Sequence, residues 1–539
     1  MRRRGSRTAW SVMAFVLLVT SGCTGGSDDA PGDDVVIGIG APRSLLPTDT
    51  LDVSGSQVLD ALFYPLVTFD EKGAPVPAAA ESVTPDAAAR VWTIKLKPGF
   101  RFHNDEPVTA DNYIDAWNFG AYGPHQQSGG SSFERIDGYA DLQSRDPDGP
   151  DGPQAAPAPK ARTLRGLRKV DDTTFKVTLS GPFAGWASTL NGPAFYPLPH
   201  AAFSAPGVLA KEYERTIVGN GPFRLSGALD GGDEIKMTRV AGFPGTAPQI
   251  GAVTWKIYRD LGDAYDDLVA GDLDVQPEIP VNRIADARGR LGDRLVTSPN
   301  SRLTFVGLPV QRPEFAKREV RRALSLAIDR DRLAEQLFHG AETPAAAFVS
   351  PVVPGYRAKT CVYCAYDPAK AKALYTAAGG PAAITIAYHR AGGYEAGIDE
   401  LCRQITTALG AGCTAAGRDS VSEVLVDAES RRGDLTRMTW TMNYPLMESY
   451  LAPVYGTGGS MNIHGYTNPA FDSLVAEGSA ASTPSAAVAE WREAEKILAE
   501  DMPIIPLFFG QNVYGHSQRV TNVVIDSTQR INLLKIGLK

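Results

Sequence analysis

The sequence is poor in the residues and motifs from which catalytic and metal sites are usually built. It has only seven histidines among 539 residues, and none of them stand at the spacing of a metal-binding pair. It also contains no His-Glu-x-x-His, no Gly-x-Ser-x-Gly and no Gly-Lys followed by Ser or Thr. These absences argue against a zinc protease, an esterase-type hydrolase and a phosphate-binding loop. We therefore expect no catalytic residues, no metal site and no cofactor.

Positive charge is also scarce. Lys and Arg total 53 against 61 Asp and Glu, a formal net charge of -8, and no basic cluster follows the N-terminus. This balance argues against a protein that binds the phosphate backbone of nucleic acids. Apolar residues make up 43% and charged residues 21%, as in ordinary globular proteins. At about 150 residues per unit, the length predicts roughly three or four packed units.

Residues 1–22 have the pattern of an export signal. Four arginines lie close to the N-terminus, and the apolar segment Ala9 to Thr20 that follows is too short to span a bilayer. The sequence Thr20-Ser21-Gly22-Cys23 resembles a bacterial lipobox, which predicts that Cys23 is lipid-modified. Residues 23–34 would then tether the fold to the extracytoplasmic face of the cell membrane. An ordinary secretory signal is the alternative.

Four further cysteines are expected in this oxidising compartment. Their even number allows three pairings, of which the local one joins Cys361 to Cys364 and Cys402 to Cys413. A Cys-x-x-Cys sequence also occurs in redox pairs and zinc sites. Here no helix starts directly at Cys364 and no pair of histidines lies nearby in the sequence, so we favour structural disulfides.

The stretch Val91 to Phe119 changes its periodicity in the middle. Apolar and polar residues alternate from Val91 to Lys97, as in a strand with one buried face. Pro98-Gly99 ends this alternation, and Thr109 stands where its hydroxyl would cap a helix that begins at Ala110. The pattern predicts a strand, a turn, a short second strand and a helix.

This stretch resembles the signature of the family 5 extracellular solute-binding proteins, which serve ABC importers of peptides, nickel and some sugars. The matching residues are Trp92, Thr93, Leu96, Gly99, Phe102, His103, Asn104, Pro107, Val108, Thr109, Ala110, Asp111 and Asn112. A second match runs from Val320 to Arg330. The resemblance covers nearly the whole chain after the signal.

The resemblance implies an α/β fold of the two-lobed periplasmic-binding-protein type (type II, cluster C) with an extra inserted subdomain. The first lobe would comprise residues 33–63, 215–305 and 512–539. The inserted subdomain would comprise residues 64–214, and the second lobe residues 306–511. Ligand would bind between lobes that close by a hinge motion.

Hydrophobic periodicity predicts the individual elements. The expected strands are Val35–Ile39, Thr174–Leu179, Val253–Ile257, Ile384–Tyr388, Leu435–Asn443 and Ile504–Phe509, and the expected helices are Gln57–Leu66, Glu319–Ile328, Glu395–Leu409 and one from Pro484. The arginines at 318, 321 and 322 are expected to face solvent. Residues 140–162, rich in Pro and Asp, are expected to form a solvated loop or a disordered segment.

By the resemblance, Arg437 to Tyr444 forms the strand along which an extended ligand lies. Strand addition uses backbone groups, so it tolerates different ligand side chains. Thr439 and Thr441 would contribute main-chain hydrogen bonds, Trp440 an aromatic wall and Arg437 a cation for a carboxylate. The other ligand-binding residues that the resemblance implies are Leu51, Val53, Asn443, Tyr444 and Asn462.

Asn443 departs from the pattern, since peptide-binding members have an Asp there that pairs with the α-ammonium of the ligand. An amide does not neutralise a buried charge, and an unpaired buried ammonium costs several kcal/mol. Either another acid, such as Glu448, Asp434 or Asp52, takes this role, or the ligand is not a peptide with a free N-terminus.

The function that the sequence predicts is that of a lipid-anchored, monomeric substrate-binding component of an ABC importer. It would capture an oligopeptide outside the membrane and deliver it to a permease that a separate ATPase drives. Sugars and metal complexes remain alternative ligands. An exported hydrolase is the alternative from a different class, although the sequence carries no catalytic signature.

Overall fold

The structure is a computed structural model, and it describes residues 32–144, 156–390, 394–429 and 435–539. The predicted export signal, Cys23, nearly all of the predicted tether, Asp434 and residues 145–155 of the predicted loop lie outside these ranges.

One large mixed sheet runs through the molecule. In the described ranges it has eleven strands, in the order β10-β11-β12-β1-β13-β19-β14-β18-β16-β17, and β15 pairs with β19. The strands are β1 (Asp34–Gly40), β10 (Phe223–Leu225), β11 (Glu234–Arg239), β12 (Ala252–Tyr258), β13 (Val275–Gln276), β14 (Leu295–Gly307), β15 (Glu342–Pro344), β16 (Ala383–His389), β17 (Gly412–Arg418), β18 (Leu435–Trp440) and β19 (Ile504–His516).

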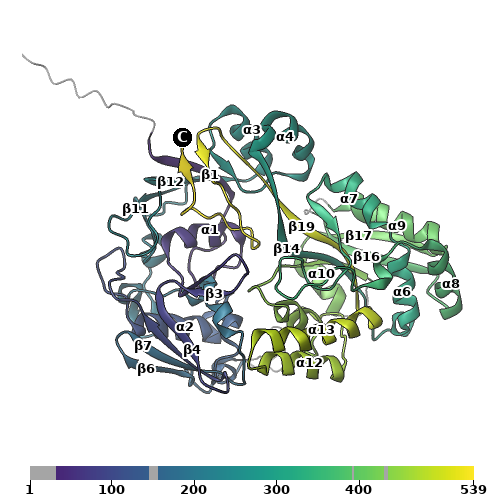
Figure 1. Cartoon of the computed structure of the whole chain (residues 1–539), viewed down its shortest axis with the longest axis horizontal. Helices are drawn as coiled ribbons and strands as arrows, with labels where there is room; N and C mark the ends of the chain where they lie inside the picture. Colours follow the sequence, from purple (N-terminus) through teal and green to yellow (C-terminus); the bar gives the residue numbers. More distant parts are fainter. Residues whose placement is uncertain (1–31, 145–155, 391–393, 430–434) are drawn as a thin grey trace, which may run out of the picture.

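Two long antiparallel strands, β14 and β19, join the two halves of this sheet (Figure 1). At one end of this strand pair, β19 pairs with β13 through Gly515 and His516. At the other end, β14 pairs with β18 from Leu303 to Gly307. Their register shifts between Pro299 and Leu303, and such an irregularity bends a strand. We call the half that carries β10 to β12, β1 and β13 the first lobe, and the half that carries β15 to β18 the second lobe.

A second, smaller sheet lies outside the large one, because the chain leaves the large sheet after β1 and returns to it at β10. Among the residues described, the small sheet has four strands in the order β4-β5-β7-β6. They are β4 (Ala80–Pro85), β5 (Val91–Leu96), β6 (Leu167–Asp171) and β7 (Thr174–Thr178). We call residues 67–209 the small unit. It shares one continuous hydrophobic core with the first lobe.

The small unit confirms the strand and helix predicted around residues 91–119. β5 covers Val91–Leu96, with Trp92 and Ile94 buried, and α2 begins at Ala110. The side-chain oxygen of Asn112 accepts the backbone N–H of Thr109 at 2.8 Å, which fixes the start of this helix.

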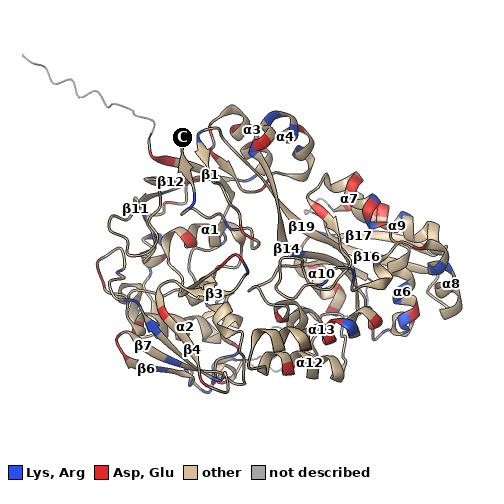
Figure 2. Ribbon diagram, viewed as in Figure 1, with Lys and Arg blue, Asp and Glu red and all other residues tan. Residues whose placement is uncertain are grey.

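Helices cover the sheets and mark where the chain changes direction (Figure 1). They are α1 (Val53–Leu62), α2 (Ala110–Ala121), α3 (Leu261–Ala270), α4 (Ile284–Leu291), α5 (Pro313–Ala316), α6 (Arg318–Leu326), α7 (Arg330–Phe338), α8 (Pro368–Ala378), α9 (Glu395–Leu409), α10 (Val421–Glu429), α11 (Glu448–Tyr450), α12 (Pro469–Ala480) and α13 (Pro484–Asp501). No helix in the described part of the chain is long and apolar enough to cross a membrane. In the ribbon of Figure 2, the positions of acidic and basic residues are interspersed along both lobes.

The helix predicted at Gln57–Leu66 begins and ends four residues earlier than expected. α1 begins at Val53 because the side chain of Asp52 accepts the backbone N–H of Gly55 at 2.7 Å. An Asp directly before a helix is the usual N-cap, and this signal outweighed the start of the apolar pattern. β18 is likewise shorter than predicted, since it ends at Trp440.

The prediction that the arginines of α6 face solvent is wrong for Arg321 and Arg322. Arg321 is only 6% exposed and donates hydrogen bonds to the backbone oxygens of Phe315, Ala316, Asp501 and Met502. Arg322 lies across the ring of Tyr363 and bonds to Glu500. These guanidinium groups tie α6 to the end of α13, whose last carbonyl oxygens lack partners within their own helix.

Both local disulfides are present. Cys361 is bonded to Cys364, and Cys402 to Cys413. The second bridge joins α9 to β17, and the first lies in the core of the second lobe. The structure thus selects one of the three pairings that the sequence allowed.

Candidate ligand-binding site

β18 has an edge that no strand in the described ranges occupies along most of its length. It pairs with β14 from Thr436 to Trp440, but with β16 only at Leu435 and Thr436. Alternate residues of an antiparallel strand direct their N–H and C=O groups away from the partner. The stretch from Arg437 to Trp440 therefore offers backbone donors and acceptors to an added strand.

Arg437 lies at the beginning of this free edge and its charge is partly removed from water. Its guanidinium carbon lies 3.3 Å from the centre of the Tyr394 ring. Burial lowers the pKa of Arg437, although Tyr394 and Glu342 oppose the shift. A desolvated guanidinium is a strong site for a planar anion, because it forms charge-assisted hydrogen bonds.

A second guanidinium group, from Arg302 on β14, shares the same surroundings. Its Nη2 lies 2.8 Å from Oε1 of Glu342, which is only 8% exposed. The negative charge of Glu278, which is exposed, also helps to raise the pKa of Arg302. The local balance is two guanidinium groups to one buried carboxylate, which favours an added anion.

Three buried polar atoms in this region have no hydrogen-bond partner among the described residues. They are Nε of Arg302, Oε2 of Glu342 and the hydroxyl oxygen of Thr304. Thr304 lies opposite Thr439 in the pairing of β14 with β18. Buried polar groups in proteins are nearly always satisfied, so these three atoms are candidates for hydrogen bonds to a ligand or water.

The predicted residues of this strand divide between its two faces. Side chains alternate, so Arg437 and Thr439 lie on one face and Trp440 on the other. Trp440 packs against the core of the second lobe, and its Nε1 donates to the backbone oxygen of Ser449 at 2.7 Å. Thr441 is half-buried just beyond the end of β18. The strand therefore brings Arg437 and Thr439 together, with Trp440 behind them.

Leu51, Val53 and Asn462 lie outside this group. Leu51 and Val53, at the start of α1, are 70% and 38% exposed. They offer apolar surface on the first lobe. The amide nitrogen of Asn462 donates to the backbone oxygens of Gly456 and Tyr466, and its oxygen accepts the N–H of Tyr466. Asn462 thus holds its own loop together, and its contact with a ligand stays a prediction.

Peptide-binding members of the family have an Asp at the position of Asn443. Each acid that was proposed to replace it, and that the structure describes, already has a partner within the chain. Asn443 itself is exposed. Glu448 is buried and forms an ion pair with Arg135, and Asp52 caps α1. A ligand ammonium near Asn443 would therefore compete with groups that these carboxylates already bind.

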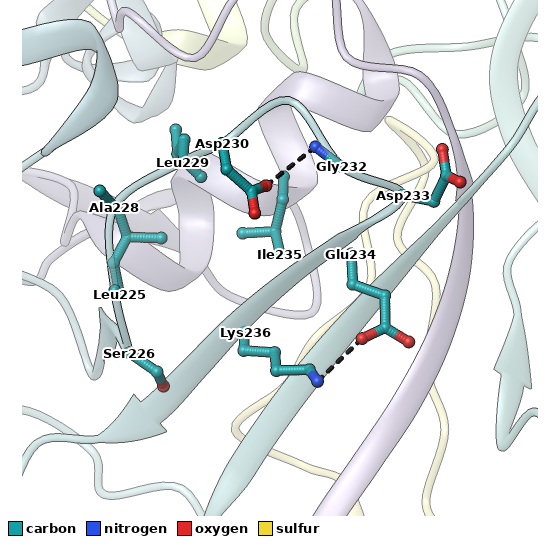
Figure 3. Close-up of a pocket in the computed structure, with 11 residues that line it drawn as sticks. Leu225, Ser226, Ala228, Leu229, Asp230, Gly232, Asp233, Glu234, Ile235 and Lys236 are labelled. Atoms are coloured by element: carbon teal, nitrogen blue, oxygen red, sulfur yellow. Dashed lines mark hydrogen bonds and ion pairs between the residues drawn. The ribbon is translucent and has the colours of Figure 1, made fainter.

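One hollow in the described surface lies elsewhere. It has a volume of about 410 Å³ and is lined by residues 225–230 and 232–236, from β10, β11 and the loop between them (Figure 3). Lys236 and Glu234, both on β11, form an ion pair at 2.9 Å. β10 lies at the other end of the sheet from β18. We do not assign the ligand to this hollow, because a ligand that drives closure must contact both lobes.

Sequence reasoning missed Arg302, Glu342 and Tyr394. Each belongs to a different part of the chain, and no spacing rule connects them. The only available signal was Arg302 itself, a charged residue directly before the apolar run that starts at Leu303. Such a residue in a buried strand needs a partner or a role.

Comparison with known proteins gives one family and a consistent fold. The profile of the family described as "Bacterial extracellular solute-binding proteins, family 5 Middle" matches residues 74–462. The periplasmic murein peptide-binding protein MppA of Escherichia coli (strain K12) is 25% identical over 478 residues, which cover 87% of this chain and 86% of that protein. The glutathione-binding protein GsiB of Shigella dysenteriae (serotype 1) is 24% identical over 502 residues, which cover 90% of this chain and 91% of that protein.

Solved structures agree on the fold. The unliganded open form of MppA has a TM-score of 0.78 and 22% identity, and the match covers 94% of this chain and 98% of that one. The Haemophilus influenzae OppA complex with RPPGFSPFR has a TM-score of 0.74 and 22% identity, over 94% and 99%. The two-lobed α/β fold of the periplasmic-binding-protein type is thereby confirmed.

Proposed function

This chain belongs to the bacterial extracellular solute-binding proteins of family 5, and from that premise we propose that it captures an oligopeptide between its lobes for an ABC importer. Residues 33–63, 215–305 and 512–539 would form the first lobe, residues 64–214 the insert and residues 306–511 the second. Cys23 would carry the lipid that holds the protein at the outer face of the cell membrane. A membrane permease and its ATPase would receive the ligand.

The free edge of β18 is the observation that carries this proposal. Four residues, Arg437 to Trp440, have no described strand beside them on that edge. An extended peptide is the ligand class whose backbone repeats the same donors and acceptors at the same spacing. A sugar or a metal complex does not repeat donors and acceptors at the spacing of a strand.

The charges beside β18 support a ligand with a carboxylate. Arg302 and Arg437 face one buried acid, Glu342. We place the carboxylate of the peptide against Arg437, where it would meet the unsatisfied Nε of Arg302. The names of the relatives, a murein peptide-binding and a glutathione-binding protein, agree with a peptide-like ligand.

Native mass spectrometry of the purified protein, followed by release and sequencing of whatever is bound, tests the proposal. A spread of short peptides is the expected result, because backbone recognition tolerates many side chains. A single non-peptide species, or a protein that no peptide stabilises against heating, would contradict the peptide assignment.

Affinity for such a peptide is expected to fall as the pH rises through the pKa of Glu342. Burial raises the pKa of this carboxyl above its usual range, although Arg302 and Arg437 oppose the shift. Below that pKa the neutral side chain leaves both guanidinium groups to the ligand, and above it the carboxylate competes for them. Uptake of one proton on binding gives up to about tenfold tighter binding for each pH unit of acidification.

Isothermal titration calorimetry across the weakly acidic range measures this dependence. The Glu342→Gln variant should bind with a flatter profile, because the titrating group is gone. The same raised pKa means that the folded chain holds more protons than the unfolded one in this window, so the contribution of Glu342 to stability falls as the pH rises. Identical pH profiles for the two proteins would contradict the role of Glu342.

A further inference from the structure

The small unit touches the second lobe at a buried ion pair. Arg135 pairs with Glu448, and its guanidinium carbon lies 4.2 Å from the centre of the Phe183 ring. Tyr444 donates its hydroxyl hydrogen to the other carboxylate oxygen of Glu448, at 2.6 Å. Glu448 is only 1% exposed. Both of its oxygens are therefore occupied by groups of the chain itself.

Close packing surrounds this pair. The backbone N–H of Ala184 donates to the oxygen of Ser479 on α12 at 3.1 Å. A Cβ atom on Gly185 would lie 2.4 Å from Cδ1 of Leu446. The segment of the small unit that carries Gly185 therefore lies so close to the second lobe that only a glycine fits there. Leu446 packs against both the core of the first lobe and that of the second. The two bodies thus meet over a continuous surface, away from the crossing strands.

This contact lies just past the end of the free edge of β18. Ser449, which follows Glu448, accepts the indole N–H of Trp440 on its backbone oxygen and the backbone N–H of Asn443 on its hydroxyl, at 2.7 and 2.9 Å. The segment that ends β18 is therefore bonded directly to the helical turn that carries Glu448. A strand-like ligand that ran along β18 past Trp440 would meet Arg135 and Phe183.

We propose that Arg135 is a specificity-determining residue that closes the cleft at the Trp440 end of β18 and so limits how far a bound peptide extends. This inference rests on the proposed peptide function. The ion pair forms only when the small unit and the second lobe are in contact, so closure and sealing occur together. A peptide long enough to pass Trp440 would have to keep this pair apart, which would leave a buried carboxylate without its partner.

The test compares a ladder of alanine peptides, from the dipeptide to the hexapeptide, on the full-length protein by competition in native mass spectrometry. We expect the wild type to retain the shorter members. The Arg135→Ala variant should raise the ratio of hexapeptide to tripeptide affinity at least tenfold, because it removes the side chain that blocks the path. The Arg168→Ala variant, which changes an exposed arginine of the same unit, should leave the ratio unchanged.

A merely structural role for Arg135 would weaken all lengths by the same factor, so an unchanged ratio overturns the inference. The Glu448→Gln variant provides a second reading if Arg135→Ala folds poorly. It keeps the shape of the side chain and its bond from Tyr444 but releases Arg135, and it should move the ratio in the same direction. Failure of the wild type to bind any member of the ladder would instead overturn the proposed peptide function, and this inference with it.

Discussion

Replacing Arg437 by glutamine is expected to weaken the binding of a peptide with a free carboxylate by roughly 30- to 700-fold, or about 2 to 4 kcal/mol. Glutamine keeps a hydrogen-bond donor but loses the positive charge. The ligand carboxylate would then lie near Glu342, a buried acid, with only Arg302 to balance the two negative charges. Calorimetry with a peptide recovered from the protein measures the loss.

Two comparisons isolate the charge of Arg437. The C-terminally amidated form of the same peptide lacks the carboxylate, so it should lose little affinity on going from the wild type to Arg437→Gln. Arg332→Gln changes an exposed arginine of the second lobe, whose side chain is 51% exposed, and should bind both peptides as the wild type does. Equal losses for the acid and the amide would show that Arg437 does not contact the carboxylate.

Replacing Arg330 by methionine is expected to lower the free energy of unfolding by at least about 3 kcal/mol. Arg330 is 3% exposed and donates to the backbone oxygens of Ser325, Cys364 and Pro506 at 3.1, 2.9 and 2.7 Å. Methionine fills a similar volume but removes the guanidinium donors from these buried oxygens, of which that of Ser325 also accepts the backbone N–H of Ile328 at 3.3 Å. Each unsatisfied buried acceptor costs about 1 to 3 kcal/mol.

Urea denaturation followed by circular dichroism measures this effect, with the thermal midpoint as a second reading. Arg332→Met is the matched control, since it makes the same exchange two positions along α7 at an exposed site. Its free energy of unfolding should lie within about 0.5 kcal/mol of the wild type. Similar losses in the two variants would mean that the hydrogen bonds of Arg330 contribute no more than helix propensity does.

Local sequence patterns were sufficient to predict most of the helices and strands that the sequence analysis named. The alternation from Val91 to Lys97 and the change to helical spacing after Thr109 correspond to β5 and α2. α8 begins at Pro368, where the side chain of Asp367 accepts the backbone N–H of Lys370, and such a cap is a contact between residues that are neighbours in the sequence. Predictions were wrong where contacts with a distant segment decide whether a side chain is buried. Arg321 is an example, because its acceptors at Asp501 and Met502 lie at the end of another helix.

The candidate site shows the same division. Arg437, Thr439 and Trp440 could be named from the sequence because they belong to one strand. Arg302 and Glu342 could not, since they come to Arg437 only through the pairing of β14 with both β18 and β19 and of β15 with β19. The free edge of β18 was equally invisible, because it depends on where β16 stops pairing.

The sequence by itself indicated the family through its motifs, and through that resemblance it implied the two-lobed α/β fold and the strand proposed to receive a ligand, because motifs, periodicity and caps depend on residues close together in the chain. The tertiary structure alone decided which charges meet. It placed Arg302 and Glu342 beside Arg437, and it paired Arg135 with Glu448 between the small unit and the second lobe. Burial and partner choice depend on packing between distant segments, and these set the charge that a ligand meets.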